Sequence, residues 1–196
     1  MKRAISLILA LVLCLSLCAC GGGTQYAKIG DTVATDRIEF VLTRFEFSNH
    51  VYASGSSKYL PISDDEIAAL PSGTQYGSAQ NGDVLATMSF SIKNIGKTQF
   101  REYADMADGS SAVYVYAFVE LEYDGYLFRD GDRSIFVDCE NGSTALELDV
   151  LEPAHNYKGY ISVPKEVMEN TDKPLYINVY FPDETGKWQK LTYRIR

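Results

Sequence analysis

Residues 84–93 read Val-Leu-Ala-Thr-Met-Ser-Phe-Ser-Ile-Lys, and this stretch decides the fold class. Apolar side chains occupy every second position from Val84 to Ile92, while most of the residues between them are polar. A period of two is the period of a β-strand, because successive side chains of a strand point to opposite faces. The segment therefore predicts a strand with one buried face.

The same period recurs along most of the chain from Tyr26 onward. Arg37 to Phe47 alternates with a slip near Val41, which indicates a twist or a bulge. Asp124-Gly125 suits a two-residue type I′ hairpin turn. Further strands are expected at Val113–Leu121, Tyr126–Phe128, Ser134–Cys139, Ala145–Leu151, Tyr157–Val163, Leu175–Phe181 and Trp188–Ile195. This pattern predicts an all-β antiparallel sandwich over residues 26–196, with a closed barrel as the alternative.

Residues 48–83 interrupt the pattern and are expected to form a long loop insertion. Ser63 to Glu66 matches a helix capping box, so one short helix is expected at Ser63–Leu70. A second helical turn is expected at Lys165–Asn170, after Pro164. The insertion is rich in Ser, Gly, Asn and Tyr, which recognition loops favour. Tyr52, Tyr59 and Tyr76 are therefore the candidate ligand contacts, and packing on the strands is the alternative for such tyrosines.

The N-terminus indicates the compartment. Lys2 and Arg3 precede an apolar run from Ala4 to Leu17, which has the layout of a signal peptide. Leu17-Cys18-Ala19-Cys20, followed by three glycines, resembles a bacterial lipoprotein signal. That resemblance implies cleavage after residue 19, acylation (palmitate among the acyl chains) of Cys20, and a flexible tether over residues 20–25. We expect a lipid-anchored protein on the extracytoplasmic side of the cell membrane, with a signal anchor as the alternative.

The charge of the chain limits its partners. The 196 residues include 18 basic and 26 acidic residues, a formal net charge of −8. Loss of the signal peptide removes Lys2 and Arg3 and leaves −10. Nucleic-acid binding requires clustered Lys and Arg, so this acidic balance argues against it. Loss of the signal peptide also leaves Cys139 as the one thiol not used for lipid. The apolar residues around Cys139 predict a buried side chain rather than a nucleophile.

Three short segments resemble a known group of proteins. They are Lys28–Val33 with Ile38–Leu42, then Ser91–Lys97, then Glu152–Pro164, although Ala154 stands where that group usually has Gly. The chain is similar here to the immunoglobulin-like domain family of bacterial secreted proteins and lipoproteins, a family of unknown function. The resemblance implies an immunoglobulin-like sandwich displayed outside the membrane, and it implies no catalytic residues. In the second segment, Asn94-Ile95-Gly96 supplies residues that tolerate the positive φ of a tight turn.

The sequence offers no recognisable catalytic set. It contains no Gly-x-Ser-x-Gly elbow, no zinc motif and no phosphate-binding glycine loop, and its two histidines, His50 and His155, are far apart. We therefore predict no catalytic residues, no metal and no cofactor. Acidic residues that could bind calcium are interpreted as solvated turn residues: Asp105, Asp108, Asp124, Asp130, Asp132, Asp138 and Glu140.

Two classes of function remain. The first is a non-enzymatic envelope lipoprotein that binds a protein or a glycan, which fits the lack of catalytic groups. The second is an enzyme or accessory subunit of envelope polymer turnover, with an acidic site that includes Asp130, Asp132 or Glu140. The sequence favours the first. Two convergent carboxylates in a cavity would favour the second.

Overall fold

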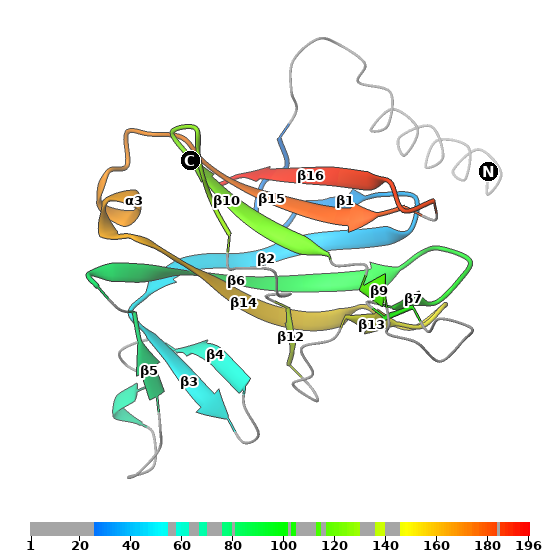
Figure 1. Ribbon diagram of the computed structural model, residues 1–196, viewed down its shortest axis with the longest axis horizontal. Coiled ribbons are helices and arrows are strands. Elements are labelled where there is room, and N and C mark those ends of the chain that lie inside the picture. Colours follow the sequence, from blue (N-terminus) through cyan, green and yellow to red (C-terminus); the bar gives the residue numbers. More distant parts are fainter. Residues whose placement is uncertain are drawn as a thin grey trace, which may run out of the picture.

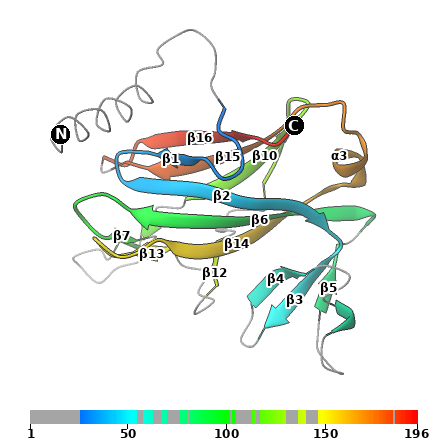
Figure 2. The same cartoon turned by 180° about the vertical axis from the view of Figure 1, so that it is seen from behind.

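Two antiparallel sheets lie face to face in the computed structural model, and a smaller sheet hangs from one end of them (Figures 1 and 2). The structure describes residues 26–54, 58–62, 67–69, 76–79, 81–101, 103–104, 113–114, 117–129, 136–139, 146–183 and 185–196. The predicted signal peptide, Cys20 and the tether lie outside these residues. No helix within the described ranges is both long enough and apolar enough to span a membrane.

The first sheet has five strands in the order β1-β2-β6-β14-β12. Their bounds are β1 (Thr32–Ala34), β2 (Ile38–Ser48), β6 (Asp83–Asn94), β14 (His155–Pro164) and β12 (Val137–Asp138). The predicted strand at residues 84–93 is β6, the centre of this sheet, and it pairs along its length with β2 and β14. The predicted slip near Val41 is a register shift between Leu42 and Arg44.

The second sheet has four strands in the order β11-β10-β15-β16. Their bounds are β11 (Tyr126–Phe128), β10 (Phe118–Tyr123), β15 (Leu175–Pro182) and β16 (Trp188–Arg194). The predicted hairpin joins β10 to β11, and both turn residues have positive φ, 48° at Asp124 and 83° at Gly125. Ala27 pairs with Tyr193, so the segment that enters β1 also covers the edge of β16.

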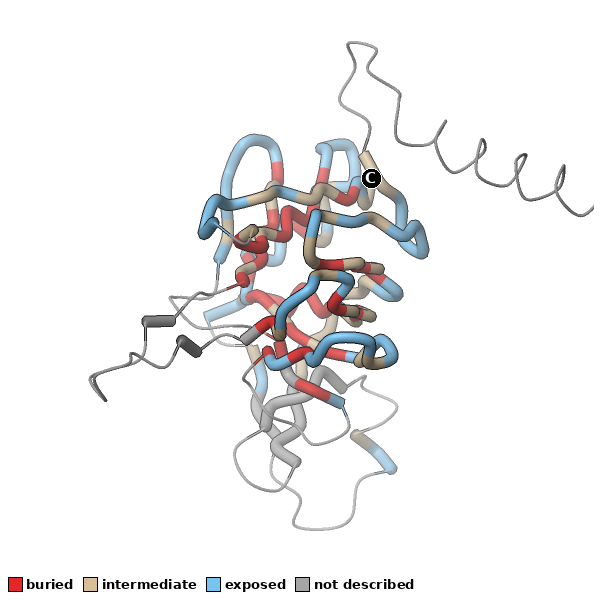
Figure 3. The backbone as a smooth tube through the Cα atoms, turned by 90° about the vertical axis from the view of Figure 1, so that its right-hand side faces the viewer, coloured by how far each residue is buried: buried red, intermediate tan, exposed pale blue. Residues whose placement is uncertain are grey.

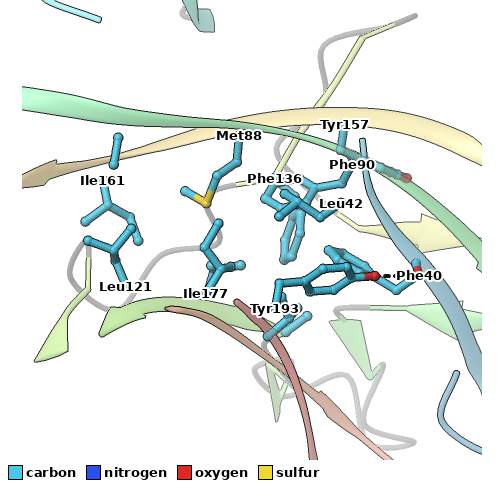
Figure 4. Packing of buried hydrophobic residues seen from close by; sticks show 14 of the residues in the cluster. Phe40, Leu42, Met88, Phe90, Leu121, Phe136, Tyr157, Ile161, Ile177 and Tyr193 are labelled. Carbon is cyan, nitrogen blue, oxygen red and sulfur yellow. Dashed lines mark hydrogen bonds between the residues drawn. The ribbon is translucent and has the colours of Figure 1, made fainter. Parts of the chain in front are cut away.

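The core lies between the two sheets, and Figure 3 shows the buried stretches of backbone on their strands. The alternating positions of β6 that the sequence assigns to the core, from Val84 to Ile92, are all buried. Figure 4 shows Met88 and Ile161 facing Leu121 and Ile177 from the opposite sheet. Tyr193 is fully buried, and its hydroxyl lies 3.0 Å from Phe40 O and 2.9 Å from Asp31 O. These contacts confirm the predicted all-β sandwich.

Shorter elements complete the described part. The predicted helical turn at Lys165–Asn170 is confirmed as α3 (Lys165–Glu169). Two pairs of short strands, β13 with β7 and β8 with β9, flank the main sheets. Their bounds are β7 (Phe100–Arg101), β8 (Tyr103–Ala104), β9 (Val113–Tyr114) and β13 (Glu147–Leu148). The single strand expected at Val113–Leu121 is thus divided between β9 and β10, which belong to different sheets.

The prediction of a long loop over residues 48–83 needs correction. It contains a three-stranded sheet in the order β4-β3-β5, with β3 (His50–Ser54), β4 (Lys58–Ile62) and β5 (Tyr76–Ser78). Tyr and Val favour strands, and backbone pairing forms a sheet even without a long alternating pattern. Of the predicted helix Ser63–Leu70, residues 67–68 are helical, and most of the remainder lies outside the described residues.

Two predictions about single residues are wrong. Cys139 is exposed, not buried, because β12 ends at Asp138 and the buried positions are Phe136 and Asp138. Neither Asn94 nor Gly96 has positive φ. Glycine is favoured at position 96 for a different reason: a Cβ there would lie 3.2 Å from Asn94 Oδ1, and the Gly96 amide donates to that oxygen over 2.9 Å.

Candidate functional site

The three tyrosines proposed from sequence lie on the small sheet. Tyr52 is in β3, Tyr59 in β4 and Tyr76 in β5. The backbone register pairs Tyr52 with Tyr76, whereas Tyr59 pairs with Ala53. The structure thus brings the three backbone positions into one sheet, and their role in binding a ligand stays a prediction.

Of the seven acidic residues considered as calcium ligands, here called the acidic cluster, the structure describes two, Asp124 and Asp138. Asp124 Oδ2 lies 2.9 Å from Lys173 Nζ, and this hydrogen bond raises the pKa of Lys173. Asp138 Oδ2 lies 3.9 Å from His155 Nδ1, on the other sheet. No group of three or more His, Cys, Asp or Glu within the described ranges is placed to hold a metal ion. Five acids of the cluster lie outside those ranges: Asp105, Asp108, Asp130, Asp132 and Glu140.

An aromatic cluster lies on the outer face of the four-stranded sheet. Val119 and Val179 point into the core, so their neighbours in β10 and β15 point outward. Phe118 and Tyr180 are register partners, and their rings stack with centroids 4.4 Å apart and planes at 15°. Trp188 packs edge-on against Phe118 at 5.1 Å and remains 45% exposed. We call these three residues, Phe118, Tyr180 and Trp188, the aromatic cluster.

Polar groups surround the aromatic cluster. The Arg129 guanidinium lies over the Phe118 ring at 5.1 Å and reaches to 4.0 Å from Glu120 Oε1. Lys190 Nζ lies 5.8 Å from the centre of the Tyr180 ring. Partial burial, followed by the hydrogen bond that the Tyr180 hydroxyl donates to Glu120, raises the pKa of Tyr180 to about 12. Tyr180 is therefore a neutral hydrogen-bonding group at physiological pH.

A buried polar network fixes the middle of this face. Asn178 has no exposed surface, although it alternates outward with Tyr180. Its Nδ2 donates to Glu122 Oε2 over 2.9 Å, and its Oδ1 accepts from Thr192 Oγ1 over 2.9 Å. The network joins β10, β15 and β16, so the side chains of the aromatic cluster stand on a rigid support.

The arrangement is suited to binding. Exposed Trp, Tyr and Arg side chains supply the largest contact energies in recognition surfaces. Glu120 and Glu122 lie on the same face, but each is engaged by a neighbouring side chain. The sequence shows the signal for this cluster in hindsight: Phe118 falls on the face opposite Val119, and Trp188 is the only tryptophan in the chain.

A second feature lies at the other end of β16. An open concavity of about 750 Å³ is formed where the N-terminal segment passes the end of the chain, and Tyr26, Lys28 and Arg194 contribute to its lining. The Tyr26 ring packs against Tyr176 at 4.7 Å.

Comparison with known proteins extends the description of the fold. No protein-family model matches the sequence, and no curated protein matches it. The structure is similar to an uncharacterised β-sandwich protein from Clostridium difficile 630, with a TM-score of 0.50, 18% identity, and coverage of 90% of this chain and 98% of that one. A candidate lipoprotein from Bacillus subtilis aligns at a TM-score of 0.40 and 7% identity, over 86% of this chain and 39% of that one. The first likeness supports the β-sandwich fold.

Proposed function

We propose that this chain is a non-enzymatic binding module, held on the extracytoplasmic side of the membrane by lipid on Cys20, which binds an envelope glycan at the aromatic cluster. The signal-like sequence before Cys20 supports the anchor. One observation supports the binding site: three aromatic rings, one of them the exposed Trp188, gather on the solvent face of a rigid sheet.

A glycan fits the chemistry of this surface. A sugar ring presents C–H groups on its faces and hydroxyl groups around its edge. The exposed Trp188 ring offers apolar contact area and packs against Phe118, while Glu120 and Arg129 beside them can accept from and donate to hydroxyl groups. The surface is also open, so it can accommodate a long chain rather than enclose a small molecule.

The enzymatic alternative has less support. A hydrolase acting on a glycan would need two carboxyl groups on opposite sides of the bond that is cleaved. The two carboxylates of β10 beside the aromatic cluster, Glu120 and Glu122, lie on the same face of a single strand. That the protein is not an enzyme stays a prediction.

The test is co-sedimentation of the full-length protein, in detergent, with purified protein-free cell-wall glycan. We expect the wild-type protein to sediment, and we expect Trp188→Ala and Phe118→Ala each to weaken binding about tenfold or more, because central aromatic residues dominate contact energy. Tyr126→Ala is the matched control, since Tyr126 is an exposed aromatic outside the cluster. It should bind like the wild type.

Two results would reject the glycan site. One is a wild-type protein that stays in the supernatant at every glycan concentration. The other is an equal loss of binding in Tyr126→Ala and Trp188→Ala, with all variants folded by circular dichroism.

A further inference from the structure

The concavity at the end of β16 is a basic site in an acidic protein. Its lining is Tyr26, Lys28, Ile29, Arg194, Ile195 and Arg196. Lys28 and Arg194 are exposed, and neither forms an ion pair with another residue that the structure describes. Asp31 Oδ2 accepts a hydrogen bond from the Lys28 backbone amide over 2.8 Å, and not from the Lys28 ammonium group.

The backbone fixes the two cationic side chains relative to one another. The amide of Ala27 donates to Thr192 O over 3.0 Å, and the amide of Arg194 donates to Ala27 O over 2.8 Å. Arg194 is thus itself hydrogen-bonded to Ala27, and Lys28 is the next residue after Ala27. The Arg196 guanidinium forms a fixed wall, because it donates to the carbonyl groups of Val167, Asn170 and Lys173.

The concavity is also close in sequence to the proposed lipid anchor. Tyr26, which lines it, is six residues after Cys20. Six residues span at most about 20 Å even when fully extended. An acylated Cys20 would thus keep this site within about 20 Å of the membrane surface. Within this range a pair of cations can reach lipid headgroups, while the net charge of −10 of the chain without its signal peptide favours keeping the rest of the surface away.

We propose that this concavity binds the phosphate of an anionic phospholipid headgroup and so docks the domain on the membrane with β16 pointing away from it. Lys28 and Arg194 supply the positive charge, and the Tyr26 hydroxyl is a further donor. Trp188 is six residues from Arg194 along β16, so docking would hold the aromatic cluster about 20 Å further from the lipid surface. The inference relies on the proposed acylation for proximity but not on the aromatic cluster.

Lysine acetylation read by mass spectrometry tests this docking. The full-length protein is reconstituted in vesicles of phosphatidylcholine alone or with roughly one third phosphatidylglycerol. We expect the anionic lipid to slow acetylation of Lys28 about fivefold, the effect of one basic group held at an anionic surface. Lys97, an exposed lysine in the loop after β6, is the control within the same molecule and should react at the same rate in both vesicles.

The Arg194→Glu variant sharpens the test. Within this variant the rate of Lys28 acetylation should become the same in the two kinds of vesicle, and Lys97→Glu should keep the wild-type difference. The mass of the purified protein reports acylation separately, so a missing anchor is distinguished from a missing lipid site.

Three results would overturn the assignment. The first is equal slowing of Lys28 and Lys97 by anionic lipid, which would indicate a general effect of the surface. The second is no slowing of Lys28 in an acylated protein. The third is the same protection of Lys28 by inorganic phosphate with neutral vesicles, which would indicate a site for a soluble anion.

Discussion

Asn94 shows how much one buried polar side chain can determine. It is 3% exposed, and its Nδ2 donates to Thr98 O over 2.9 Å and to Leu148 O over 3.0 Å, while its Oδ1 accepts from the Gly96 amide. The amide thereby fixes the loop after β6 and connects it to the short strand β13. The sequence identified this residue as part of a turn, but the turn depends on its side chain and not on positive φ.

Removing this side chain should be costly. We expect Asn94→Ala to lower the free energy of unfolding by about 2–4 kcal/mol, because the buried Leu148 carbonyl, the partly buried Thr98 carbonyl and the Gly96 amide lose their partner. Asn170→Ala is the control, since the Asn170 side chain only accepts one exposed hydrogen bond, from the Asp172 amide over 3.3 Å. Urea unfolding of both variants measures the difference, and equal midpoints would refute the assignment.

At the scale of elements, the sequence predicted the strands whose alternation is regular. The sequence predicted five strands to within a few residues: β2, β6, β14, β15 and β16. Each of these strands has one face in the core, which produces a hydrophobic period of two. The helical turn α3 and the Asp124-Gly125 hairpin were also expected, since local chemistry specifies them. The sheet of β3, β4 and β5 was missed because its strands are short and lie in a segment rich in Ser, Gly and Asn, residues that are typical of loops.

The hairpin provides a prediction at this scale. Gly125 has φ of 83°, and a Cβ there would meet no atom within 4 Å. We expect Gly125→Ala to destabilise the protein by about 1–2 kcal/mol, because an L-residue with a side chain is strained in the left-handed region even where space is available. Thermal unfolding measures this, and an unchanged melting temperature would contradict the type I′ turn.

The binding face illustrates why the site was harder to predict than the fold. Phe118, Tyr180 and Trp188 belong to three strands, and only the pairing of β10 with β15 and of β15 with β16 brings them together. Sequence composition pointed instead to the tyrosines of residues 48–83. Which strands become neighbours depends on contacts between distant residues, and a single sequence does not record that order.

For the whole molecule, the burial of tyrosine side chains makes the free energy of unfolding fall as the pH becomes alkaline. Burial raises the pKa of Tyr193, and burial together with the charge of Asp138 raises the pKa of Tyr157, above the usual value near 10. As pH rises past about 10, the unfolded chain loses these protons first, so unfolding becomes favoured. The stability that these two tyrosines contribute is fully present below pH 10 and is lost progressively above it.

Urea unfolding at pH 9 and pH 11 measures this effect. We expect the wild-type free energy of unfolding to fall by up to about 1.4 kcal/mol per pH unit for each buried tyrosine. Tyr193→Phe should be about 1 kcal/mol less stable at pH 9, because the Asp31 and Phe40 carbonyl groups lose a donor, and should depend less on pH between 9 and 11. An identical dependence on pH in both proteins would contradict the burial of this hydroxyl.

The measurement that tests the central claim most directly is fluorescence of the protein's single tryptophan during titration with soluble cell-wall glycan oligosaccharides. Trp188 is the only tryptophan in the chain, so all of this signal arises at the aromatic cluster. We expect a saturable change in emission, shifted to about tenfold higher glycan concentration in Phe118→Ala, because the ring that Trp188 packs against edge-on is gone. An emission spectrum that does not change with glycan, or one titration curve shared by Phe118→Ala and the wild type, would contradict binding at this face.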